Sequence, residues 1–184
     1  YSLTDPVIWG RGRGCAFVSD ACVSTSGTAQ AGFCATRDNQ QRFCTETGDA
    51  IGYCGSASYS ADLPAPFRYF AGSPNVGGLT PTADYCPYVR PYSNGQCANA
   101  ASAPTTNYRA EAWAPGSRCM ASSLSQFFNG GRPDTATMSA GCYPNRCTSA
   151  GLLEVGLTTS SGAVIWLTCA TAGATLTPPV RTRR

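Results

Sequence analysis

The chain has 184 residues, of which 42% are hydrophobic and 12% are charged, and its formal net charge is +3. This length fits one domain or two small ones. An ordinary apolar fraction with low charge excludes a disordered chain, and so small a net charge gives no support for a nucleic-acid partner.

Eleven cysteines are spread through the chain, and they indicate where it is found. Reducing compartments rarely hold such a set unless it binds metal. Zinc sites favour closely spaced cysteines and histidine ligands, whereas this chain has no His. We therefore expect structural disulfides and an extracellular or cell-surface location. Because eleven is odd, one thiol is free, or its partner lies on another chain or on missing sequence.

The first half of the chain offers little periodicity. Residues 15–54 hold five cysteines, which predicts a loop-rich block joined by disulfides. Aromatic residues and prolines interleave over residues 53–92, and we interpret them as a small core built from turns, with a ligand-binding stripe as the alternative. Asp84 precedes Tyr85 and Cys86, so we expect it to be partly buried and to cap backbone rather than catalyse.

The second half gives clearer elements. Residues 98–115 are rich in Ala, Ser and Thr and predict an exposed loop, and residues 117–128 predict a short helix that ends before glycines. Alternating apolar residues over 152–159 and an apolar run over 163–169 predict two strands, joined by a three-residue loop. The expected fold is mainly β with much irregular structure: a loop-rich cystine block, a small antiparallel sheet and few short helices.

The absence of His excludes several reaction mechanisms. Neither a Ser-His-Asp nor a Cys-His arrangement can form within this chain, and no His-based zinc site can form either. Among the ten acidic residues no pair stands out for glycoside hydrolysis. We expect no catalytic residue, no metal ligand and no bound cofactor in this chain.

One stretch is far more specific than composition. Residues 82–97 contain D-Y-C-P-Y-V-x-P-Y-S-N-G-x-C, which resembles the signature of the leishmanolysin family of surface zinc metalloproteases. The run W-G-x4-C-x-F-x4-C from Trp9 to Cys22 is similar to another block of that family, and further agreement follows at 51–54 and 67–70. The resemblance covers nearly the whole chain and is strongest over residues 9–97.

The resemblance implies a role without catalysis. The family's zinc ligands and its general-base Glu precede the matched region, so they have no counterpart here. The chain then corresponds to the C-terminal region, which braces the upstream catalytic and central domains and contributes to contacts with protein substrates. Zinc is expected only in the intact parent. A stand-alone extracellular adhesion module derived from the family and a degenerate full-length copy are the alternatives.

The resemblance, together with the pattern of residues along the chain, implies domain boundaries and raises the question of an anchor. Residues 1–21 would be the tail of the central domain, 22–95 the cystine block, 96–176 a small antiparallel β subdomain and 177–184 a basic tail. We see no transmembrane segment, since no stretch approaches the roughly 18 apolar residues that a spanning helix needs. A GPI anchor in the precursor and release of the protein are both open.

A cystine pattern follows from the same resemblance. It implies that Cys147 pairs within the last segment, where we expect Cys169, and that Cys15, unpaired in this chain, bonds a cysteine upstream. The other implied pairs are Cys22–Cys86, Cys34–Cys54, Cys44–Cys119 and Cys97–Cys142.

Overall fold

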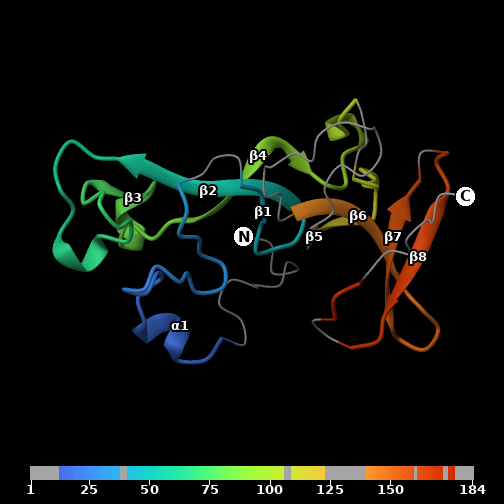
Figure 1. Cartoon of the computed structure of the whole chain (residues 1–184), viewed down its shortest axis with the longest axis horizontal. Helices are drawn as coiled ribbons and strands as arrows, with labels where there is room; N and C mark the ends of the chain where they lie inside the picture. The colour runs from blue at the N-terminus through green and yellow to red at the C-terminus, as the bar shows by residue number, and fades with distance from the viewer. Residues whose placement is uncertain are drawn as a thin grey trace, which may run out of the picture.

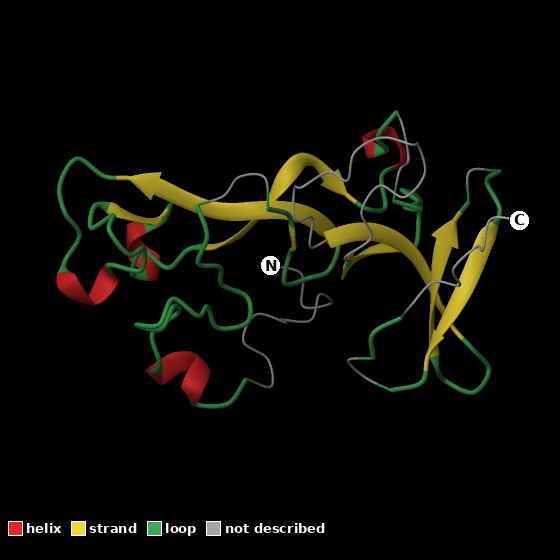
Figure 2. Cartoon of the chain, in the orientation of Figure 1, coloured by secondary structure: helices red, strands yellow, loops and turns green. Residues whose placement is uncertain are grey.

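The computed structural model describes residues 13–37, 41–105, 109–122, 140–159, 161–171 and 174–176. These residues form two antiparallel sheets of four strands each, with only short helical segments, which confirms the expected fold class (Figures 1 and 2). The strands are β1 (Phe43–Cys44), β2 (Ala50–Ser58), β3 (Val76–Gly78), β4 (Tyr88–Gln96), β5 (Ser117–Ala121), β6 (Ala140–Cys147), β7 (Leu153–Thr158) and β8 (Val164–Cys169). The helical segments are α1 (Ala16–Ser19) and the 3-10 turns Ala65–Phe67, Pro81–Ala83 and Ala100–Ser102.

The first sheet is organised around β2, which pairs with β1, β3 and β4. Its small residues are a requirement of this arrangement. A side chain at Gly52 would collide with the carbonyl of Arg90, and one at Gly78 would collide with the carbonyl of Cys86. Backbones therefore approach closely here, as glycine permits.

The second sheet has the order β5-β6-β7-β8 and contains the expected hairpin. The β7 and β8 strands pair from Leu153↔Cys169 to Thr158↔Val164, which confirms the two strands predicted here. The Thr159 N–H donates to the Ala163 carbonyl at 2.7 Å and closes the loop. Gly162 has a φ of 82°, a conformation that favours glycine at this position.

The helix predicted over residues 117–128 is wrong where it can be checked. Residues 117–121 form β5, which pairs with β6 from Ser117↔Pro144 to Ala121↔Ala140. Cys119 lies in the centre of this strand, is 7% exposed, and is bonded to Cys44. Tertiary pairing thus overrides weak helix propensity. Residues 123–128 and the expected glycine cap lie outside the described residues.

The two sheets lie end to end along the long axis of the molecule (Figure 1) and share a buried cluster where they meet. Two of the four disulfides join the sheets at this point. The turn between β1 and β2 also contacts one cysteine of each of these two bridges, since Cys97 N–H donates to the Asp49 carbonyl and Cys119 N–H to the Gly48 carbonyl. The cluster consists of Ile51, Cys97, Cys119, Ala140 and Cys142.

The exposed loop predicted over residues 98–115 is only partly correct. Described residues up to 105 are mostly exposed, but the chain then turns inward and Glu111 is 3% exposed. There the segment lies between two strands that diverge: Ala112 N–H donates to the Cys142 carbonyl of β6, and Thr158 N–H of β7 donates to the Ala110 carbonyl. Unpaired backbone groups of β6 and β7 are satisfied in this way.

Candidate functional site

Four disulfides join the described residues, and they are the four pairs that the family resemblance implies. Their Cα–Cα distances range from 5.2 to 5.9 Å, within the usual range for cystines. The first two bridges hold the first sheet and the loops before it, and the other two join the sheets. The pairs are Cys22–Cys86, Cys34–Cys54, Cys44–Cys119 and Cys97–Cys142.

The D-Y-C-P-Y segment begins with two successive residues in the left-handed region, Asp84 at a φ of 52° and Tyr85 at 56°. This conformation is costly for residues with a side chain. It directs the Tyr85 ring onto Tyr59, at 5.1 Å between centroids, and onto Phe67, at 5.7 Å. Asp84 is exposed, which corrects the expectation of a partly buried carboxyl, because the sharp turn holds it outside this aromatic cluster.

The second part of the same segment joins three loops. Cys86 is bonded to Cys22, and Pro87 is fully buried with its carbonyl accepting the Cys34 N–H at 3.0 Å. Tyr59 and Tyr69 donate their hydroxyls to backbone carbonyls at the rim. The most specific sequence motif of the chain is therefore a structural junction, and the aromatic residues around it form a small core of turns.

Cys147 and Cys169 are not bonded to each other, contrary to the expected pair. Cys147 is the last residue of β6 and Cys169 the last of β8, and both are in register with Leu153 of β7, which lies between them. Two strand spacings separate their Cα atoms by about 10 Å, beyond the roughly 7 Å that a disulfide can bridge. The sheet itself prevents this pair.

Cys15 is exposed and immediately precedes α1. The surrounding segment is held against the first sheet's loops by the stack of Phe17 on Phe33, at 5.8 Å, and by the ion pair between Arg13 and Glu46, at 2.9 Å. All eleven cysteines lie in described stretches, so none of the other ten bonds Cys15 in this structure. The Cys15 thiol is thus presented at the surface by ordered neighbours.

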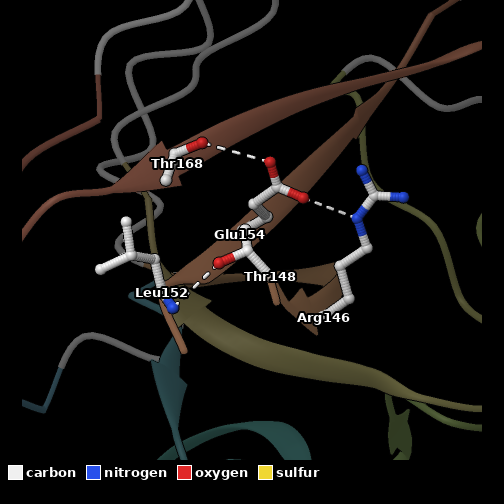
Figure 3. Close-up of polar contacts among 5 residues, drawn as sticks. All are labelled: Arg146, Thr148, Leu152, Glu154 and Thr168. Atoms are coloured by element: carbon white, nitrogen blue, oxygen red, sulfur yellow. Dashed lines mark hydrogen bonds and ion pairs between the residues drawn. The ribbon is translucent and has the colours of Figure 1, made fainter. Parts of the chain in front are cut away.

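A polar group that sequence analysis did not single out lies on one face of the second sheet (Figure 3). Arg146 of β6 donates to Glu154 of β7 at 2.6 Å, and Thr168 of β8 donates to the other oxygen of Glu154 at 3.2 Å. The hydrogen bond from Arg146 holds the pKa of Glu154 below its ordinary value. The guanidinium of Arg146 also lies 4.0 Å from the centre of the Trp166 ring.

Glu111 is a second carboxylate that the sequence did not reveal. Its Oε1 accepts the Cys142 N–H at 3.0 Å. Burial raises its pKa, while this hydrogen bond and the charges of Arg109 and Arg42 oppose the rise. The neighbouring Tyr143 hydroxyl contacts Ser122 at 2.8 Å, and burial raises its pKa to about 12. Glu111 is thus held by the Cys142 N–H and by the charges of two arginines, which indicates a structural role where the sheets meet.

The residues present do not fit zinc. The chain has no His, and eight of its cysteines are consumed in disulfides. Within the described part of the chain, no group of three or more His, Cys, Asp or Glu side chains could hold a metal ion. In the same residues no helix has the length and apolar character needed to cross a bilayer.

Comparison with known proteins gives a consistent result. The family model described as leishmanolysin matches residues 1–183. Leishmanolysin of Leishmania tropica is 32% identical over 141 residues, which are 76% of this chain and 20% of the relative. A leishmanolysin homolog of Crithidia fasciculata is 30% identical over 151 residues (82% and 23%), and a leishmanolysin-like peptidase of Drosophila melanogaster is 24% identical over 177 residues (80% and 26%). The chain spans about a fifth to a quarter of these relatives.

Proposed function

Because the chain belongs to the leishmanolysin family, we propose that it is the non-catalytic C-terminal region of a cell-surface zinc metalloendopeptidase. Proteolysis would be carried out by upstream residues of the parent protein, which would also hold the zinc. The lack of His supports this division of labour, because the chain cannot supply the histidine ligands of such a site.

The observation that carries the proposal is the exposed Cys15 thiol beside a network of four disulfides. Exposed thiols are uncommon in disulfide-rich extracellular proteins, where they usually find a partner. Cys15 lies seven residues before Cys22, the first member of the internal network. A bond from Cys15 to an upstream cysteine would therefore connect the catalytic part directly to a cross-linked body.

The proposed role is to brace the catalytic region. Two sheets joined by Cys44–Cys119 and Cys97–Cys142 make a support whose parts are covalently fixed. The disulfides also support an oxidising, extracellular or surface location. Family membership favours this role over a stand-alone adhesion module, for which we find no specific supporting contact among the described residues.

The covalent connection predicts a specific peptide map. In the intact protein, digestion without reduction should release a Cys15 peptide joined to a peptide from the sequence before Tyr1, and reduction should separate the two. Cys15→Ser should remove this species and leave the Cys22–Cys86 peptide in place as the internal control. A free Cys15 thiol in the intact protein would contradict the proposed connection.

The division of labour is tested by activity. The purified 184-residue chain should not cleave casein, whether or not zinc is added, whereas the intact protein should cleave it in a chelator-sensitive manner. Chelator-sensitive cleavage by the 184-residue chain alone would overturn the proposal. An upstream sequence without an H-E-x-x-H motif would instead identify the parent as a degenerate copy and contradict an active peptidase.

A further inference from the structure

The outer edge of β8 has no strand partner among the described residues. This strand is the last in its sheet, and in the described part of the chain its backbone pairs only with β7. Its sequence, Val-Ile-Trp-Leu-Thr-Cys, contains no charged residue, no Pro and no Gly. Edge strands of monomeric proteins usually carry such residues, or a bulge, to prevent pairing with another chain.

The hydrogen-bond pattern shows which backbone groups point outward. The bond from Thr159 N–H to the Ala163 carbonyl marks that pair as hydrogen-bonded. In antiparallel strands such pairs alternate with pairs whose N–H and C=O groups point away. The outward residues of β8 are therefore Val164, Trp166 and Thr168. Consistently, the Thr158 N–H turns away from its partner Val164 and donates to the Ala110 carbonyl.

Two exposed large hydrophobic side chains lie on β8 itself, and two more lie at the other end of the hairpin, where β7 begins. Among the described residues five large hydrophobic side chains are exposed, and four of them belong to this hairpin. On β8 these are Val164 at 39% and Ile165 at 37%, one on each face of the sheet, while Leu152 and Leu153 are each 39% exposed at the start of β7. The fifth is Val18 on α1. Partner strands cover such edges in stable assemblies.

We propose that β8 pairs with β8 of a second copy of this chain, antiparallel and around a two-fold axis at Trp166. Centring the axis on Trp166 uses all three outward residues, because Val164 then bonds Thr168 of the second copy and Trp166 bonds its own counterpart. A two-fold contact needs a strand that is complementary to itself. The β8 strand meets this need, since it has no charge that a second β8 would repel.

The side chains of the two copies match in this register. Ile165 lies opposite Leu167 of the second copy on one face, and the Trp166 rings are neighbours on the other, where Arg146 already covers one side of each ring. Aromatic and β-branched cross-strand pairs of this kind stabilise antiparallel sheets. The β5–β8 sheet of one copy and the β5–β8 sheet of the second copy would then form one continuous sheet of eight strands.

The first test measures the mass of the 184-residue chain, folded with its four disulfides, by sedimentation equilibrium at increasing concentration. The wild-type chain should approach twice its 19.1 kDa. Ile165→Lys should remain monomeric at the same concentrations, because a charge would face Leu167 of the second copy. Val18→Lys, which removes the one exposed large hydrophobic side chain of α1, should dimerise like wild type. A monomeric wild-type chain, or a dimer that survives Ile165→Lys, would overturn the proposal.

The second test fixes the register. In the proposed pairing Ala163 lies opposite Cys169 of the second copy, whereas within one chain these residues are about 20 Å apart along the strand. In a Cys15→Ser, Cys147→Ser background, Ala163→Cys should therefore yield a disulfide-linked dimer whose peptide map joins residues 163 and 169. Adding Cys169→Ser should abolish that link. Absence of the 163–169 link in a chain that dimerises would overturn this register and with it the assigned interface.

Discussion

At the scale of single residues, Glu111 is the most consequential side chain that composition and spacing did not reveal. It comes from a segment rich in small residues, and only the tertiary structure brings it to the Cys142 N–H at 3.0 Å. Burial is the main cause of its raised pKa, and the nearby charges of Arg109 and Arg42 reduce the rise. A sequence pattern cannot express this environment, because its parts come from β6, from the 109–113 segment and from the residue before β1.

Glu111→Gln should flatten the pH dependence of stability. Because the folded pKa lies above the ordinary value of 4.5, the folded state binds more protons than the unfolded state between these values. The free energy of unfolding should therefore fall as the pH rises from about 4.5 through the folded pKa. In the Gln variant this decline should be absent from urea midpoints measured between pH 4.5 and 8. An unchanged decline would contradict the assignment to Glu111.

Glu111→Ala is the matched variant that removes the hydrogen bond as well. It leaves the Cys142 N–H without its acceptor inside the protein, which typically costs about 1–3 kcal/mol. The Ala variant should therefore be less stable than the Gln variant at pH 5, and because neither variant carries a carboxyl at this position, the difference reports the hydrogen bond alone. Equal stability of the two variants at this pH would show that the hydrogen bond contributes little.

At the scale of elements, the sequence predicted the β7–β8 hairpin but neither β2 nor β5. The hairpin has alternating apolar residues and a Gly at the turn, and both signals are local. The β2 strand is rich in small residues and lacks alternation, since Gly52 is packed against the Arg90 carbonyl of β4 and Gly55 against the side chains of Arg90 and Leu79. The β5 strand forms because Cys119 is fixed to Cys44 and pairs with β6. Strands that depend on such non-local contacts show no hydrophobic periodicity in their own sequence.

Glu154 should stabilise the second sheet in a pH-dependent way. Its folded pKa lies below the ordinary 4.5, chiefly because Arg146 donates a hydrogen bond to it. The contribution is therefore present above pH 4.5 and is lost as the pH falls through the folded pKa. Glu154→Gln should lower the melting temperature at pH 7 by a few degrees or less, as expected for a surface contact, and should have a smaller effect at pH 3.

Asp62→Asn is the matched control for Glu154→Gln. Asp62 is more exposed, and its carboxylate lies 3.6 Å from Arg68, whereas the Arg146–Glu154 contact is 2.6 Å. Its effect on the melting temperature at pH 7 should be the smaller of the two. If Asp62→Asn destabilises as much as Glu154→Gln, general charge removal rather than the Arg146 contact is responsible.

At the scale of the whole molecule, the disulfides determine whether the two sheets act as one body. The family resemblance implied the four observed pairs, whereas spacing alone left the connectivity open. The expected Cys147–Cys169 pair, which rested on Cys169 being the partner left for Cys147 in the last segment, does not form, because the order of strands in this sheet places β7 between them. For these two residues the cysteine pattern carried no information about the strand that separates them.

Removing one bridge between the sheets should reduce both stability and cooperativity. Cys97→Ser with Cys142→Ser should cost about 2–5 kcal/mol and should produce two calorimetric transitions, where we expect one for the wild-type chain. Cys34→Ser with Cys54→Ser is the control within the first sheet. The Cys34–Cys54 bridge closes a separation of 20 residues, whereas Cys97–Cys142 closes one of 45. The entropic part of the stability lost with Cys34–Cys54 should therefore be ~0.7 kcal/mol smaller, and the calorimetric transition should stay single. A single transition after loss of Cys97–Cys142 would contradict the coupling.

The connectivity of these bridges also orders the events of synthesis. Once residue 86 has emerged into an oxidising compartment, Cys22–Cys86 and Cys34–Cys54 can both close, before the second sheet has emerged. Cys44 and Cys97 must then wait, as reduced thiols, for Cys119 and Cys142. During that interval Cys44 and its neighbours are the chain's most vulnerable point for mispairing. Efficient production should therefore depend on a disulfide isomerase acting while the C-terminal half is still being made.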